Sequence, residues 1–331
     1  MKIVCITGMH RSGTSVVARV VNLLGVYLGQ EGEHIPASRN NPRGFWESKP
    51  IKDFNAQLLK QLGGSWHSPP ILPDGWQQAG ELDPLRKKAA ALLNRVLGHV
   101  DVGGWKDPRT SLVLPFWRTV TPVEHTVLTL RHPQEVAASL VARNGFGPER
   151  SAQLWLRYVV AAWRADPACL LVDYEDFFTD CDATVDSLAR GLGLAAPSSG
   201  TKDEVRAFFD PALRRHAERL RAGETMRLAE VVHGQLRSSE PSMLLPLADA
   251  LQALWVQQDA GKRQDQALRA ARRRADREQS ELERLRALPA VRAALAFSRL
   301  TTAALEFVRR KSGKRAVAVG VSSASPRRLS G

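Results

Sequence analysis

Short apolar runs alternate with segments of helical periodicity through the first two hundred residues of the chain. The first run is rich in β-branched residues, and each run has the length of a buried strand and is followed by apolar residues at helical spacing. The strand-like runs are residues 2–7, 123–130 and 169–172, and the helical segments that follow them are residues 14–24, 134–141 and 183–192. This alternation predicts an α/β fold, with a mostly parallel sheet of roughly four or five strands and helices on both faces.

Other segments of this region have a different pattern. Helical periodicity extends over residues 52–62, 82–97 and 154–163, whereas residues 29–50 are rich in Gly, Pro, Asn and Ser. We therefore expect further helices that cover the sheet, and one long irregular loop. Long loops of this kind often carry function.

The strand pattern ends near residue 198. Beyond it, residues 204–220 and 246–258 have helical periodicity and are bounded by Pro and Gly. The sequence therefore predicts an α/β core over residues 1–198 and a helical annex over residues 199–260.

The remaining residues predict a basic helical extension over residues 261–315. Apolar residues at heptad spacing make its first part a candidate coiled coil for self-association, although Pro289 ends the repeat after two to three heptads. The seam residues are Leu268, Ala275, Leu282 and Leu285. Residues 290–311 predict an amphipathic helix with a basic face, which suits an anionic membrane surface. Residues 316–331 are rich in Ser and Arg and are expected to be disordered.

The net charge of +13 is concentrated in this extension. Residues 262–331 contain 18 Lys and Arg against six Asp and Glu, which accounts for +12 and leaves +1 for the first 261 residues. Nucleic acid is therefore not the expected partner of the α/β core, and anion chemistry there must come from a few placed groups.

The cysteines and the N-terminus indicate a cytoplasmic protein. Only Cys5, Cys169 and Cys181 are present, without the spacing of a disulfide framework or a zinc site. The first residues resemble neither a signal peptide nor a spanning helix. We expect a location in the cytoplasm, with the basic helix placing the protein at the inner face of the membrane.

The segment from Gly8 to Ser15 carries the clearest chemistry. Gly8 and Gly13 have the spacing of the phosphate-binding loop GxxxxGK[ST], but Thr14 takes the place of the lysine. Backbone N–H groups of such a loop and the N-terminus of the following helix bind an anion. The positive side chain must then come from Arg11. Hydroxyl donors for the anion are Ser12, Thr14 and Ser15.

At this point the chain resembles a known family. The Gly8–Ser15 segment is similar to the [RK]SGT[ST] signature of the P-loop-like sulfotransferase superfamily, which uses 3'-phosphoadenosine 5'-phosphosulfate (PAPS). A strand ending in Arg131-His-Pro133, with Ser139 eight residues after the arginine, resembles its 3'-phosphate signature. Residues 170–176, Leu-Leu-Val-Asp-Tyr-Glu-Asp, resemble a later strand of many members.

The resemblance implies a sulfotransferase fold with a helical C-terminal extension, and PAPS as the sulfuryl donor. It assigns donor binding to residues of both signatures, and no metal is expected. These residues are Arg11, Ser12, Gly13, Thr14, Ser15, Arg131 and Ser139.

A further segment, Lys106-Asp-Pro-Arg109, is similar to one in tyrosylprotein and bacterial carbohydrate sulfotransferases. The resemblance implies that Lys106 stabilises the leaving phosphate and that Glu47 of the long loop is the general base. Arg11 and Lys106 are expected to stabilise the charge that builds on the sulfuryl and bridging oxygens. The RKGxxGDW segment of small-molecule sulfotransferases is missing, so a carbohydrate or glycolipid hydroxyl is the expected acceptor. His34 and His67 stay alternatives for the base.

Two other functions stay open on the sequence. A P-loop kinase of a small molecule would need ATP and Mg²⁺, with Asp173 as a metal-holding carboxylate, but Thr14 in the lysine position argues against it. A non-enzymatic adaptor would act through the basic extension on a membrane or nucleic acid. His10 and Asp173 are expected to have structural roles.

Overall fold

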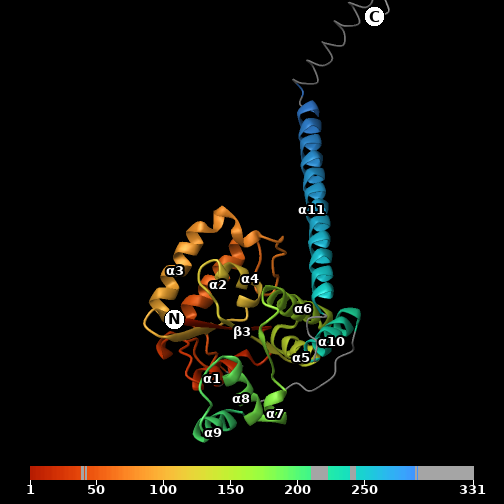
Figure 1. Ribbon diagram of the computed structural model, residues 1–331. Coiled ribbons are helices and arrows are strands. Elements are labelled where there is room, and N and C mark those ends of the chain that lie inside the picture. The colour runs from red at the N-terminus through yellow and green to blue at the C-terminus, as the bar shows by residue number, and fades with distance from the viewer. Residues whose placement is uncertain (39–40, 42, 210–222, 239–243, 288, 290–331) are drawn as a thin grey trace, which may run out of the picture. The chain divides into compact units, whose positions relative to one another are not determined.

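The computed structural model describes residues 1–38, 41, 43–209, 223–238, 244–287 and 289 (Figure 1). The chain divides into two units, Met1–Asp259 and Ala260–Gly331. The strands are β1 (Lys2–Gly8), β2 (Val102–Lys106), β3 (His125–Leu130) and β4 (Leu170–Asp173). The α-helices are α1 (Thr14–Leu23), α2 (Lys49–Gln61), α3 (Asp83–Leu97), α4 (Thr110–Arg118), α5 (Pro133–Asn144), α6 (Pro148–Ala165), α7 (Asp176–Thr179), α8 (Cys181–Gly191), α9 (Ser199–Phe208), α10 (Glu224–Leu236) and α11 (Leu245–Ala287).

The four strands form one parallel sheet in the order β2-β1-β3-β4. The predicted α/β class, with a parallel sheet flanked by helices, is confirmed. Because all four strands run in the same direction, their carboxyl ends meet at one edge. From β1 the chain crosses to β2 on one side of β1, and from β2 it crosses back to β3 on the other side of β1. Sheets of α/β proteins bind ligands at the point where the strand order reverses in this way.

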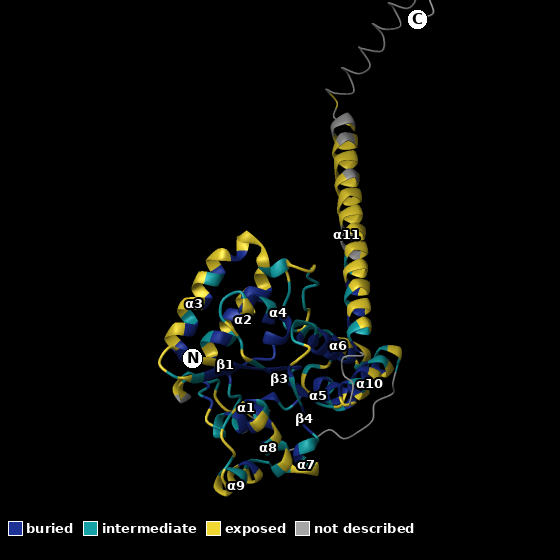
Figure 2. Ribbon diagram, in the orientation of Figure 1, coloured by how far each residue is buried: buried dark blue, intermediate teal, exposed yellow. Residues whose placement is uncertain are grey.

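Both faces of the sheet are covered, as β1 shows by its alternating side chains. Ile3 and Cys5 belong to a hydrophobic core with α2 to α6 and α10, whereas Val4 and Ile6 belong to a second core with α1, α8 and α9. Figure 2 shows the strands buried between these two layers. The continuous apolar character of β1 follows from this two-sided burial.

Some elements differ from the expected ones. The periodicity predicts a helix from residue 204, but α9 begins earlier because the Ser198 side chain accepts a hydrogen bond from the Thr201 N–H (3.1 Å) and caps it. It ends at Phe208, and residues 210–222 lie outside the described part. The helix expected over residues 246–258 is longer than predicted, since α11 continues to Ala287.

Three helices, α4, α7 and α10, have no counterpart in the expectations. Helix α4 contains Pro115, a residue that usually interrupts helices. Helix α7 has only four residues, and α10 lies between the helices predicted over residues 204–220 and 246–258. The amphipathic helix expected over residues 290–311 and the tail 316–331 lie outside the described residues. Of the four seam residues only Leu268 has a described side chain, which is exposed. Within the described residues no helix has the length and apolar character needed to cross a membrane.

A buried polar cluster holds the chain after β2. The Asn55 amide of α2 donates to Asp107 (2.8 Å) and to Thr110 (3.2 Å), and its oxygen accepts from the Trp117 indole (2.8 Å). The Trp105 indole also donates to Thr110 (3.1 Å). All five side chains belong to fully buried residues. The cluster therefore ties α2, α4 and the end of β2 together, next to Lys106.

We expect Asn55→Leu to lower the free energy of unfolding by about 2–4 kcal/mol, because it leaves the Trp117 N–H without its acceptor and removes a donor from Asp107. Gln57→Leu, the same kind of change on the exposed face of α2, is the matched control and should stay within about 0.5 kcal/mol of the parent. Urea unfolding measures both. Equal stability of the two variants would show that the cluster contributes nothing.

Candidate functional site

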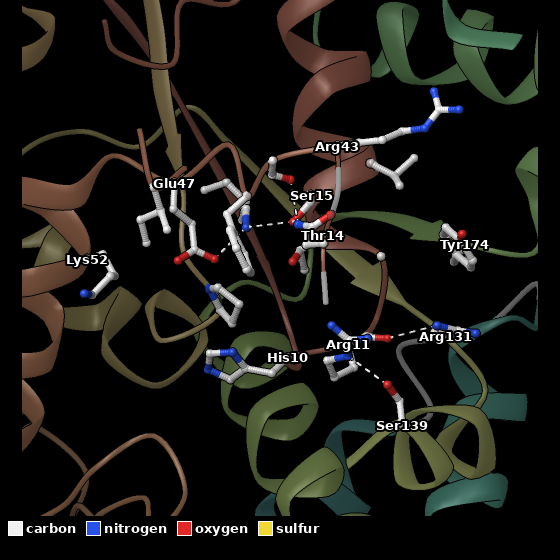
Figure 3. A pocket seen from close by; sticks show the side chains of 18 of the residues that line it. His10, Arg11, Thr14, Ser15, Arg43, Glu47, Lys52, Arg131, Ser139 and Tyr174 are labelled. Atoms are coloured by element: carbon white, nitrogen blue, oxygen red, sulfur yellow. Dashed lines mark hydrogen bonds and ion pairs between the residues drawn. The ribbon is translucent and has the colours of Figure 1, made fainter. Parts of the chain in front are cut away.

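A cavity of about 360 Å³ opens at the carboxyl ends of the strands (Figure 3). Its wall is formed by the Gly8–Ser15 loop, the long loop before α2, the turn after β2, and residues that follow β3 and β4. Among the described lining residues, seven are Arg or Lys and one, Glu47, is acidic. The basic residues are Arg11, Arg43, Lys52, Lys106, Arg109, Arg131 and Arg143. The cavity therefore favours an anionic ligand.

The Gly8–Ser15 loop has the backbone of an anion-binding turn. Gly8 (φ 134°), Arg11 (φ 72°) and Gly13 (φ 87°) all have positive φ. Such a backbone is costly for an arginine, by about 1–3 kcal/mol, and persists where the surrounding structure requires it. A Cβ at Gly13 would overlap the Tyr174 ring, so this close approach requires glycine. Helix α1 begins directly afterwards and points its N-terminus toward the cavity.

The loop hydroxyls are placed for a ligand to different degrees. Ser12 is fully buried, and its Oγ has no hydrogen-bond partner among the described residues. Ser15 Oγ accepts from the Asn41 amide (3.1 Å) and from Lys106 Nζ (3.3 Å). Thr14 also lines the cavity. An unpaired buried hydroxyl is costly, and Ser12 is not among the described residues that line the cavity.

Arg11, Arg131 and Ser139 come together although 120 residues or more separate the loop from the other two. Arg11 Nε donates to Ser139 Oγ (2.8 Å), and the Arg131 guanidinium donates to the Arg11 carbonyl (3.2 Å). Arg131 is also paired with Glu135 (2.8 Å) and lies 5.0 Å from the centroid of the Tyr174 ring. The two sequence signatures therefore form one continuous surface of the cavity.

Glu47 and Lys106 form a buried ion pair on the other side of the loop. Lys106 Nζ lies 2.6 Å from Glu47 Oε1, and the two side chains are 1% and 9% exposed. Lys106 thus pairs with Glu47 and not with its sequence neighbour Asp107. Figure 3 shows Glu47 on the Ser15 side of the loop, with Arg131 and Ser139 on its other side.

Arg109 and Asp107 order the turn between Lys106 and α4. Asp107 Oδ1 accepts from the Arg109 guanidinium (2.8 Å) and from the Arg109 N–H (3.1 Å). Burial would lower the pKa of Arg109, but the nearby carboxylates of Asp107 and Glu47 raise it. The guanidinium therefore stays charged at the cavity wall.

The histidines differ in their access to the cavity. His34 Nε2 lies 3.0 Å from the Leu28 carbonyl, and neither His34 nor His67 belongs to the described lining. His10 does line it, and its ring packs against Trp66 (4.8 Å between centroids). Burial, followed by the charges of Arg109 and Lys106, holds the pKa of His10 well below its usual value. His10 is therefore a neutral imidazole at neutral pH.

Asp173, the carboxylate that a kinase would use for Mg²⁺, has protein partners. It accepts from His233 Nε2 (2.8 Å), from the Glu175 N–H (2.9 Å) and from Arg237 (2.9 Å). These contacts support the structural role expected for it. Within the described residues no group of His, Cys, Asp and Glu has the arrangement of a metal site.

Several lining residues were not predicted as site residues. Tyr174, Phe208 and Phe209 form an aromatic wall, and Arg43 lies over the Phe208 ring (5.1 Å) and donates to the Ala207 carbonyl (3.0 Å). Asn41 donates to Ser15. Tyr174 lies in the segment 170–176, and the likeness of this segment to a later strand of many sulfotransferases could have identified it as a site residue. Phe208 and Phe209 carry no local signal because α9 reaches the cavity only through the tertiary fold.

No family model and no curated protein matches the chain. Among solved structures, the sulfotransferase domain of the olefin synthase of Synechococcus PCC 7002 has a TM-score of 0.44 and 16% identity, covering 70% of this chain and 93% of that one. The sulfotransferase STF1 of Mycobacterium tuberculosis has a TM-score of 0.39 and 16% identity (70% and 75% covered). The sulfotransferase STF9 of Mycobacterium avium has a TM-score of 0.39 and 11% identity, covering 73% of this chain and 76% of that one. The chain is thus similar, at these values, to three sulfotransferases.

Proposed function

We propose that the chain is a PAPS-dependent sulfotransferase that transfers a sulfuryl group to an acceptor hydroxyl. The observation that carries the proposal is the contact between Arg11 and Ser139 (2.8 Å). It joins the segment that resembles a 5'-phosphosulfate loop to the segment that resembles a 3'-phosphate site. PAPS carries both anionic groups on one nucleoside, so a ligand of this kind would span the two segments.

The residues present fit such a donor. Thr14 and Ser15, which line the cavity, would hold the 5'-phosphosulfate together with the loop N–H groups and the start of α1. The buried Ser12 hydroxyl of the same loop, which has no partner among the described residues, is a further proposed donor. Arg131 and Ser139 would hold the 3'-phosphate, since a guanidinium and a hydroxyl both donate to phosphate oxygens. Arg11 lies between the two groups. The glycine required at residue 13 lets the Tyr174 ring pack against the loop backbone.

In this proposal PAPS supplies an activated sulfuryl group, and the chain supplies positive charge and a proton acceptor. Arg11 and Lys106 stabilise negative charge that grows on the oxygens of the transferred and leaving groups. Glu47 accepts the proton of the acceptor hydroxyl. All three side chains line the cavity, and Glu47 is its single described carboxylate.

The contact between Glu47 and Lys106 gives the lysine two roles. It neutralises the buried carboxylate, because an unpaired buried charge is strongly destabilising. It also lies 3.3 Å from Ser15 Oγ, at the edge of the anion loop. Lys106 is thus placed between the proposed base and the proposed donor site, where it can contact both.

We further propose a carbohydrate or glycolipid as the acceptor. This rests on the likeness of the 106–109 segment to carbohydrate sulfotransferases and on the aromatic and polar lining beyond Glu47. Trp66 and Phe45 offer flat apolar surfaces, and Lys52 and Arg109 offer donors to ring oxygens and hydroxyls. Such a mixture suits a polar ring compound.

The basic extension has a proposed role in location. Its charge of +12 would attract it to anionic lipids at the inner face of the membrane. A cytoplasmic enzyme held there would meet glycolipid acceptors. The helix is also a candidate for self-association, and Leu268, which is 69% exposed, is the described residue of its seam.

The test of the proposal is calorimetric titration of the full chain with 3'-phosphoadenosine 5'-phosphate (PAP), set against ATP with Mg²⁺. We expect PAP to bind, because the cavity has donors for both of its phosphates, and ATP with Mg²⁺ to bind more weakly. Tight binding of ATP with Mg²⁺ and no binding of PAP would favour the kinase and end the sulfotransferase proposal.

For Glu47 the informative change is Glu47→Gln. Glutamine keeps an oxygen for Lys106 but cannot take a proton, so turnover should fall by about 10²–10⁴-fold while PAP affinity is retained. Glu47→Ala would leave Lys106 unpaired and costs about 3–5 kcal/mol of stability, so its inactivity would prove little. Glu33→Gln, on the same loop, is the control. Near-normal turnover of Glu47→Gln would remove Glu47 from the role.

Ser139→Ala should weaken PAP binding by about 10–100-fold, since a hydrogen bond to a charged group is lost. Adenosine 5'-monophosphate (AMP), which lacks the 3'-phosphate, should bind the variant almost as well as the parent. Ser151→Ala removes another buried serine hydroxyl, bonded to the Gly147 carbonyl (3.0 Å), and is the control. An equal loss for both nucleotides would show that Ser139 acts only through Arg11.

A further inference from the structure

Helix α10 lies at the end of the sheet against α5 and α6 (Figure 1). Glu149 of α6 fixes its start, since the carboxylate accepts from the Gly223 and Thr225 N–H groups (3.0 Å each). Gln134 of α5 donates to Glu230 (2.5 Å). The helix therefore has a defined position relative to the segment that follows β3.

One α10 side chain, His233, reaches the carboxyl end of β4. It is buried, and its Nε2 lies 2.8 Å from Asp173 Oδ2. Burial alone would raise the pKa of Asp173, but the hydrogen bond from His233 and the neighbouring donors hold it below its usual value. Asp173 is therefore an ionised acceptor, and His233 Nε2 carries the proton that it donates.

The same imidazole also contacts the segment after β3. Its ring centroid lies 5.3 Å from that of His132 and 6.1 Å from that of Trp155. The Trp155 indole donates to the Arg131 carbonyl (3.1 Å). The His233 ring therefore packs against His132, which follows Arg131 in the chain, and against Trp155, which binds the Arg131 carbonyl.

His233 thus joins the two segments that carry donor-site residues. Asp173 precedes Tyr174, whose ring packs on Gly13 and lies under the Arg131 guanidinium (5.0 Å). Arg131 in turn donates to the Arg11 carbonyl. Figure 3 shows Tyr174 and Arg131 on the same side of the cavity as Ser139.

We propose that His233 is a positioning residue for the 3'-phosphate of the donor: it aligns the Arg131 and Tyr174 segments through the Asp173 hydrogen bond and the His132 and Trp155 contacts. The inference rests on the proposed function and adds a residue that lies outside both sequence signatures. His233 does not line the cavity among the described residues, so it acts through its neighbours and not on the ligand.

Two substitutions separate the hydrogen bond from the ring contacts. His233→Phe keeps a ring against His132 and Trp155 but has no donor for Asp173. His233→Gln places an amide nitrogen near the position of Nε2 and restores the donor. Val232→Ala removes buried volume from the same helix without touching Asp173, and is the control for general loosening of α10.

The measurement is the ratio of PAP affinity to AMP affinity, obtained by calorimetry on the full chain well below each variant's unfolding temperature. We expect His233→Phe to lower the ratio about tenfold, His233→Gln to restore most of it, and Val232→Ala to leave it unchanged. A structural role alone would lower the unfolding temperature without changing the ratio. If His233→Phe does not fold, His233→Met, smaller and more flexible, replaces it.

The outcomes distinguish this inference from the proposed function. If the parent chain binds PAP and His233→Phe or His233→Met keeps the parent's ratio, His233 has no positioning role, and the sulfotransferase proposal stands. If Val232→Ala lowers the ratio as much, the effect belongs to the packing of α10 and the inference is wrong. If the parent chain does not bind PAP, the proposed function and the inference both fail.

Discussion

The packing of the Gly13 backbone against the Tyr174 ring is the constraint on which the site depends. The left-handed backbone at Gly13 directs the loop into α1, and the missing side chain lets the aromatic ring close over it. Tyr174 then supports the Arg131 guanidinium, and Arg131 holds the Arg11 carbonyl. One glycine therefore allows the segments that follow β1, β3 and β4 to pack together at the cavity.

Charge in the cavity is arranged in pairs, and this matters because the first 261 residues are close to neutral. Arg131 is held by Glu135, Arg109 by Asp107 and Lys106 by Glu47. Each pair lowers the cost of keeping a cation partly buried. The cations are oriented before any ligand arrives, so little reorganisation is needed when negative charge appears. A few placed groups can therefore replace a strong overall field.

The local parts of this arrangement could be predicted from the sequence. Strand and helix periodicity gave the parallel sheet, and the glycine spacing with Arg11 gave the loop. The resemblance supplied Arg131, Ser139, Lys106 and Glu47, and the structure places all of them on one cavity. Their chemical roles stay predictions. What sequence could not show is contact between distant segments: the Asn55 cluster joins residues more than fifty apart, and His233 has no neighbour in sequence that indicates its partner Asp173.

The part of the chain that contains the sheet and the sequence signatures is shorter than the part that contains every contact around the site, because helix α10 comes later. All four strands, the glycine loop and the Arg131 segment lie before residue 174, and a chain ending after α9 would keep every one of them. It would lack His233 and Arg237, so the Asp173 carboxylate would lose its imidazole and guanidinium partners. Sequence signatures alone therefore define too short a boundary for this protein. A shortened chain that keeps the contacts of Asp173 must extend through Arg237.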